Sequence, residues 1–157
     1  AKAHADMALM QNPNDQYSIC LLGLALTCNG HVAEGQSYSA ESFKLNPLAP
    51  ETCLYALALG AYLEGNFADA VNGFARISGA YDEVLACLAA ALWNLGQQDT
   101  ARAAMQRFMT LKRQKMAEYP HDDVEKWRSY LLRLMPIADP ARLEKLFEGF
   151  RNAGLPV

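Results

Sequence analysis

Length, composition and charge limit what this chain can be. It has 157 residues, of which 52% are hydrophobic and 20% charged, enough for one compact domain or a short superhelix. No apolar run reaches the roughly 18 to 20 residues that a membrane-spanning helix needs, so we expect no membrane insertion by this segment. Residues 1–98 carry three basic and nine acidic side chains, whereas residues 99–157 carry eleven and eight. The acidic first half argues against nucleic acid binding there.

The first part of the chain is predicted to form paired helices that turn at glycine. Residues 1–10 have the spacing of the second helix of such a pair. A complete pair follows over about 15–45, with its turn at Gly30. Pro47 and Pro50 end this pair, because proline lacks the amide hydrogen and disfavours helix in the residue before it.

Two further pairs of the same kind follow. The pair over about 50–78 turns at Gly65, and the pair over about 82–118 turns at Gly96. On both sides of each glycine, apolar residues recur at three- and four-residue spacing, which indicates one apolar face per helix. In the second helices of the three pairs, the positions that repeat in this way are Gly35, Ser39 and Ser42, then Ala70, Phe74 and Ile77, then Ala101, Met105 and Phe108.

Residues 119–157 are predicted to form two helices outside this pattern. Asp122 or Asp123 caps the first of them. Asp139 caps the second, and Gly154 terminates it. Because the last repeat must hide an apolar face that no further repeat buries, we interpret both helices as a cap.

Two spacings repeat along the chain. The turn glycines are 35 and 31 residues apart, and Pro13 and Pro47 are 34 apart. Each copy also alternates a large apolar residue, a small one, a turn glycine and a small crossing residue: Leu22, Gly23, Gly30 and Gly35 with closing Pro47, then Leu57, Ala58, Gly65 and Ala70 followed by Phe74. This pattern resembles the tetratricopeptide repeat family.

The resemblance implies an all-α, TPR-like helix-turn-helix solenoid that forms a right-handed superhelix. Its repeats would occupy residues 1–118, as a partial first repeat and three hairpins. The capping helices over 119–157 would pack on the repeats, so that the whole chain forms one continuous domain.

The tail carries a second, shorter pattern, made of Asp139-Pro140, Glu144, Gly149 and the run Phe150-Arg151-Asn152-Ala153-Gly154-Leu155-Pro156. It is similar to the carboxyl-terminal tetratricopeptide region of bacterial multidomain proteins with a class III adenylate or guanylate cyclase domain. The similarity implies a bacterial source and a regulatory role beside an enzyme domain. No catalytic residue of a cyclase can be carried over to this segment.

No signature of catalysis or cofactor binding is present. The sequence contains no phosphate-binding glycine loop, dinucleotide fingerprint, zinc-protease motif or nucleophile elbow. His4, His31 and His121 have no cysteine or aspartate at ligand spacing, which favours surface histidines over a metal site. We therefore predict that this segment is not an enzyme and has no cofactor or metal.

The four cysteines lie within predicted helices, on or near their apolar faces, and form no C-x-x-C pair; they are Cys20, Cys28, Cys53 and Cys87. Small buried thiols are the favoured interpretation. A disulfide is the alternative if the segment lies outside the cytoplasm. We expect a soluble protein, with the cytoplasm favoured as its compartment.

Partner binding is expected on the concave side of the stacked pairs, which the first helix of each pair lines. The family register places Tyr17, Leu24, Tyr55, Leu59, Tyr62, Leu63, Trp93 and Asn94 there, with Thr52, Glu83 and Ala90 among their neighbours. This surface is apolar and aromatic, which suits a peptide or a partner helix. Two interpretations stay open: the groove is an open site, or hairpin packing and the two terminal helices cover it.

We predict a non-catalytic protein interaction or scaffold module. The alternative is a regulatory or self-association arm of a multidomain bacterial signalling enzyme such as a nucleotide cyclase, which would pair into a homo-oligomer through its acidic and basic halves. The basic run is interpreted as a solvated helix face; a site for an acidic partner is its alternative, and nucleic acid is least favoured. That run comprises Arg102, Arg107, Lys112, Arg113 and Lys115.

Overall fold

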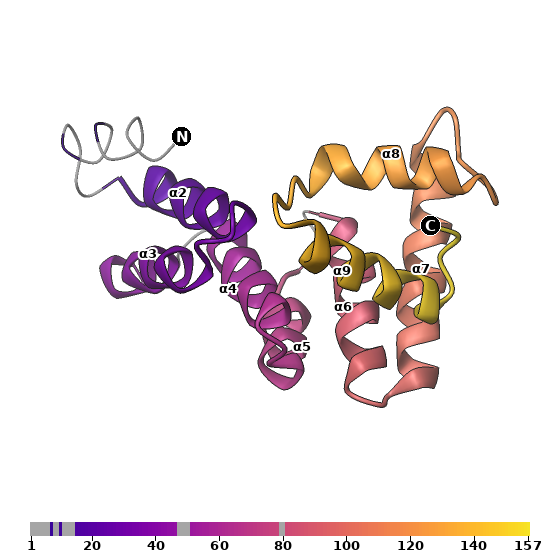
Figure 1. Ribbon diagram of the computed structural model, residues 1–157, viewed down its shortest axis with the longest axis horizontal. Coiled ribbons are helices and arrows are strands. Elements are labelled where there is room, and N and C mark those ends of the chain that lie inside the picture. Colours follow the sequence, from indigo (N-terminus) through magenta and orange to yellow (C-terminus); the bar gives the residue numbers. More distant parts are fainter. Residues whose placement is uncertain (1–6, 8–9, 11–14, 47–50, 79–80) are drawn as a thin grey trace.

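The computed structural model describes Met7, Met10 and residues 15–46, 51–78 and 81–157, and these are the residues whose structure is considered (Figure 1). Within them the chain is all-helical and has no strand, so the expected all-α class is confirmed for this part. The helices are α2 (Gln16–Cys28), α3 (Val32–Leu45), α4 (Glu51–Leu63), α5 (Phe67–Ala75), α6 (Glu83–Asn94), α7 (Gln98–Lys115), α8 (Val124–Leu134) and α9 (Pro140–Ala153). The helix expected over 1–10 and the prolines at 13, 47 and 50 lie outside the described residues.

Consecutive helices pack as three pairs, α2 with α3, α4 with α5 and α6 with α7. The three turns share one geometry, because Gly30, Gly65 and Gly96 all have φ between 84° and 88°. In each turn the residue after the glycine donates its N–H to the carbonyl five residues earlier, at 2.8 to 2.9 Å. Glycine adopts this left-handed conformation without a steric penalty, so the structure places all three predicted turn glycines at turns.

Small residues allow the paired helices to approach closely. A β-carbon at Gly35 of α3 would lie 2.5 Å from the carbonyl oxygen of Gly23 in α2. In the next pair, a β-carbon at Gly73 would lie 2.7 Å from that of Ala58. Both distances are too short for a real side chain, so glycine at these crossings sets the separation of the helices.

The largest buried side chains lie in the second and third pairs and in the C-terminal helices. Tyr62, Phe74, Phe108, Trp127 and Phe147 all belong to one core cluster and are essentially inaccessible to solvent. The first pair contributes Cys28 and Val32 to this cluster. It buries Ile19, Leu22 and Leu26, together with Thr27, Ser39 and Ser42. Apolar burial is therefore concentrated toward the C-terminal end of the molecule.

The two C-terminal helices begin and end as expected. Asp123 rather than Asp122 caps α8, since its carboxylate accepts from the N–H of Lys126 at 3.0 Å. Asp139 caps α9 by accepting from the N–H of Ala141 at 2.9 Å. Gly154 ends α9 with φ 108°. Helix α9 packs on α6 and α7, and Figure 1 shows it lying across them.

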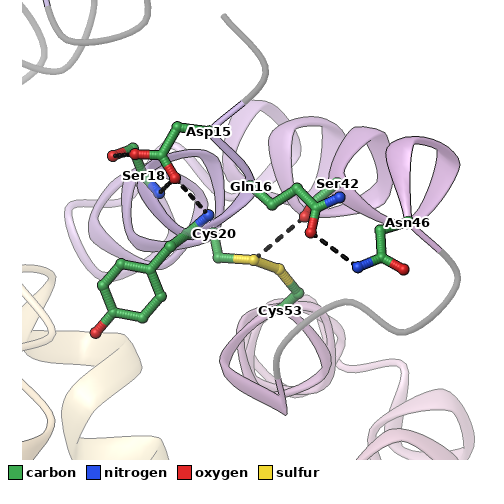
Figure 2. The surroundings of a disulfide bond; sticks show 8 residues. Asp15, Gln16, Ser18, Cys20, Ser42, Asn46 and Cys53 are labelled. Atoms are coloured by element: carbon green, nitrogen blue, oxygen red, sulfur yellow. Dashed lines mark hydrogen bonds between the residues drawn. A yellow bond between two sulfur atoms is a disulfide. The ribbon is translucent and has the colours of Figure 1, made fainter. Parts of the chain in front are cut away.

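A disulfide joins the first two pairs. Cys20 of α2 and Cys53 of α4 are bonded, with their Cα atoms 5.0 Å apart (Figure 2). The interpretation of all four cysteines as free thiols is therefore wrong for these two, because α4 packs against α2 and brings the two positions together. It holds for Cys28 and Cys87, which are free and buried.

Candidate partner-binding groove

Helix α9 fills one part of the predicted groove. A β-carbon on Gly149 would lie 2.6 Å from the hydroxyl oxygen of Tyr62 and 2.8 Å from the β-carbon of Ala90, both on the predicted groove face. The Tyr62 hydroxyl donates to the carbonyl of Lys145 at 3.3 Å. At the start of α9, Arg142 forms an ion pair with Glu64 at 2.9 Å. The groove is thus covered where α9 crosses α4 and α6.

Three predicted binding residues belong to the core cluster. Leu59, Tyr62 and Leu63 are buried, and burial raises the pKa of the Tyr62 hydroxyl well above its ordinary value. A partner approaching the covered part would meet the outer face of α9. These three side chains therefore act as core in this conformation.

Trp93 and Asn94 lie at the edge of the covered part. The Trp93 ring is half-buried, with the guanidinium of Arg102 5.2 Å from its centre. Asn94 is exposed, but its amide nitrogen donates to the Ala90 carbonyl at 2.8 Å and to the Tyr62 hydroxyl at 3.2 Å. Both side chains already have partners within the chain.

The other part of the predicted groove is an open hollow of about 250 Å³. Its lining joins α2, α4, the start of α6 and the end of α8: Tyr17, Leu21, Leu24, Thr52, Tyr55, Tyr81, Glu83, Leu134 and Met135. Among these, Tyr17, Leu21, Tyr81 and Leu134 are 59%, 43%, 47% and 46% exposed. We name this hollow, with these nine residues, the α2–α8 hollow.

Five of the nine lining residues belong to the predicted groove face, and four do not. Leu21, Tyr81, Leu134 and Met135 come from another face of α2, from the segment before α6 and from the end of α8. No repeat register marks them, because they meet the groove only through tertiary packing. No signal in the sequence marks these four positions as parts of one surface.

The floor of the hollow is apolar and uncharged. The Tyr55 hydroxyl lies 3.9 Å from the Cys87 sulfur, which lies 3.6 Å from the Met135 sulfur. Burial raises the pKa of Cys87 to about 12 and raises that of Tyr55 well above its usual value. Both groups are therefore protonated at neutral pH, so neither supplies a thiolate or phenolate nucleophile there. The arrangement suits binding of an apolar group.

An ion-pair cluster closes the α6 side of the hollow. Lys112 of α7 pairs with Glu83 and, at 3.3 Å, with Asp82, while the Tyr130 hydroxyl donates to Glu83. Burial alone would raise the pKa values of both carboxyl groups, but hydrogen bonds from Lys112, Lys115 and Tyr130 outweigh it and lower them. Both carboxylates stay ionised at neutral pH.

The same cluster corrects the interpretation of the basic run. Lys112 is 7% exposed, so it is not part of a solvated face. Lys115 also pairs with Asp82, at 2.8 Å. The acidic half of the chain pairs here with the basic half of the same chain. The other members of the run, Arg102, Arg107 and Arg113, are exposed.

The described residues contain neither a metal-ligand cluster nor a membrane-spanning helix. They contain no group of three or more histidine, cysteine, aspartate or glutamate side chains that could hold a metal ion. None of their helices combines the length and the apolar character needed to cross a membrane. Comparison of the sequence with protein-family models and with curated proteins found no match.

Proposed function

We propose that this chain is a protein interaction module, built as a TPR-like right-handed solenoid, that holds a peptide or partner helix in the α2–α8 hollow. The observation that carries the proposal is the gathering of Tyr17, Leu21, Tyr81 and Leu134, all substantially exposed, around one apolar concavity. Large apolar side chains left in water at one place favour a partner that buries them. Tyrosine is also among the residues that most often dominate binding energy.

The spacing within the chain supports a repeat architecture. Three helix pairs with equivalent glycine turns follow one another, and α4 contacts both helices of the first pair. The hollow accepts side chains rather than a charged terminus, because its one ionised lining group, Glu83, is already paired. We therefore expect the partner to insert leucine, methionine or phenylalanine side chains.

The test begins with a random peptide library selected on the immobilised full chain, followed by calorimetric titration of the enriched peptides. Tyr17→Ser, Leu21→Ser and Tyr81→Ser should each weaken binding by about tenfold or more, or about 1.4 kcal/mol. Leu132→Ser is the matched control, because Leu132 is 39% exposed on α8 but does not line the hollow. Peptides that bind all four variants as tightly as the wild type would refute the proposal.

A regulatory self-association arm of a bacterial signalling enzyme, such as a nucleotide cyclase, remains the second proposal. It rests on the resemblance of the tail and on attraction between an acidic and a basic half. Lys112, Lys115 and Arg142 make ion pairs with Asp82, Glu83 and Glu64 of the same chain. Because these charges are neutralised internally, less charge is left for pairing between copies, and we rank this proposal below the first.

A further inference from the structure

We propose that the Cys20–Cys53 disulfide determines whether the α2–α8 hollow exists, so that the surface is present in the oxidised protein and lost on reduction. The bond joins the two helices that form one side of the hollow. Figure 2 shows it crossing from α2 to α4, with Ser42 of α3 beside the Cys20 sulfur. The inference concerns the integrity of this wall and does not depend on which partner binds.

The bonded cysteines lie within the wall itself. Cys20 is one residue from Leu21, and Cys53 follows directly after Thr52; both neighbours line the hollow. Tyr17 and Leu24 flank Cys20 at three- and four-residue spacing and also line it. Any movement of α2 away from α4 therefore removes three lining side chains together.

At two equivalent positions the first pair buries smaller side chains than the other pairs do. At the positions where α5 buries Phe74 and α7 buries Met105, α3 buries Ser39. The next equivalent position is Ser42, where the other pairs have Ile77 and Phe108. The interior of the first pair is thus lined by small and polar side chains at positions where the other pairs have large apolar ones. Less apolar area is buried at these two positions, so they contribute less hydrophobic stabilisation.

One of these serines adds a cost. The Ser39 hydroxyl oxygen is buried, and the described part of the chain offers it no hydrogen-bond partner. A buried polar group without a partner destabilises the folded state. Hydrogen bonds between the first pair and the rest of the described chain include one from Ala138 N–H to the Cys28 carbonyl at 2.8 Å and one from Gln36 to the Leu57 carbonyl at 3.5 Å. The disulfide adds a covalent connection between α2 and α4.

The redox step is a two-electron exchange with a dithiol. One thiolate of the dithiol attacks a sulfur of the Cys20–Cys53 bond, and its second thiolate then displaces that sulfur. The protein gains two electrons and two protons as two thiols, while the dithiol becomes a cyclic disulfide. Both protein sulfurs are in fully buried residues, so α2 must first move aside. We therefore expect the reduction rate to level off at high dithiol concentration.

The test uses the full chain with dithiothreitol as the reducing agent and amide hydrogen exchange as the measurement. On reduction, amides of α2 and α3 should exchange at least about tenfold faster, whereas those of α6, α7 and α9 should change less than about twofold. The two tryptophans, Trp93 and Trp127, lie outside the first pair and should keep their fluorescence. The double variant Cys20→Ala/Cys53→Ala should behave as the reduced protein does, with or without reductant.

A further variant distinguishes loss of structure limited to α2 and α3 from destabilisation of the whole chain. Adding Ser39→Ala to the cysteine double variant removes the unpaired hydroxyl and should restore part of the protection in α2 and α3. Unchanged protection of α2 and α3 in the reduced wild type would overturn the proposal. Loss of protection throughout the chain, together with a shift in tryptophan emission, would also overturn it, because the bond would then support the whole fold. Binding of the selected peptides is measured separately, so a failure of the proposed function remains distinguishable.

Discussion

Gly149 offers a direct test of whether α9 is seated in the groove. A β-carbon there would lie 2.6 Å from the Tyr62 hydroxyl and 2.8 Å from the Ala90 β-carbon. The Tyr62 ring is fully buried, and Ala90 is fixed in α6 with its Cα also only 3.4 Å away. Gly149→Ala should therefore displace α9 slightly away from α6.

Two opposing effects set the size of the change. Replacing glycine by alanine within a helix stabilises it by about 1 kcal/mol. Overpacking a filled interface costs about 1 to 3 kcal/mol, and the upper end applies because α9 also buries Leu146, Phe147 and Phe150. The net expectation is a loss of about 2 kcal/mol. For a chain of this size, the melting temperature should fall by about 4 to 8 °C.

The assay is urea and thermal unfolding followed by tryptophan fluorescence, with Asn152→Ala as the matched control. Asn152 is exposed on the same helix, so its replacement should change the free energy of unfolding by less than about 0.5 kcal/mol. Combining Gly149→Ala with Tyr62→Phe removes the nearer oxygen and should recover part of the loss. A Gly149→Ala protein as stable as the wild type would show that α9 does not approach α4 and α6 this closely.

Three further predictions concern buried polar groups. Lys112→Met leaves Glu83 without its charged partner and should cost about 3 kcal/mol in urea unfolding, whereas Lys115→Met, at a 57% exposed side chain, should cost less than about 1 kcal/mol. Because the folded-state pKa values of Asp82 and Glu83 are lowered, the unfolded chain binds more protons in acid. Stability should therefore fall as pH drops below about 5, and less steeply in Lys112→Met. In the oxidised protein, Ser39→Ala should raise the free energy of unfolding by about 1 kcal/mol, because an unpaired buried hydroxyl is removed.

The turns and the helix pairs could be predicted because their causes are local. A turn with φ near 84° requires glycine, and a helix with one apolar face shows apolar residues at three- and four-residue spacing. Both features are visible in a short stretch of sequence. The close crossing of Gly23 and Gly35 was readable for the same reason. The capping aspartates Asp123 and Asp139 also act on amides two or three residues away.

The candidate site was only partly predictable, because it depends on contacts between distant segments. Tyr17, Leu24 and Tyr55 line the hollow as the groove register suggests, but Leu134 and Met135 reach it from the end of α8. The apolar spacing within each helix does not indicate which apolar residues α9 will cover. The disulfide was not assigned for a similar reason, since the two sulfurs belong to different pairs and meet only when those pairs pack.

The two parts of the groove face differ in what stabilises them. Leu59, Tyr62 and Leu63 are buried in the core cluster, and α9 lies against the Tyr62 hydroxyl, so this part of the groove face exposes none of these three side chains. Helix α9 does not reach α2. The pair formed by α2 and α3 has Ser39 where the other pairs have Phe74 and Met105, and a disulfide joins it to α4. Two of the four exposed lining residues, Tyr17 and Leu21, thus lie on α2, which the disulfide joins to α4. Breaking the Cys20–Cys53 bond can therefore release α2 from α4 while the core of the other helices stays folded. This is the physical basis for expecting the α2–α8 hollow to depend on redox state.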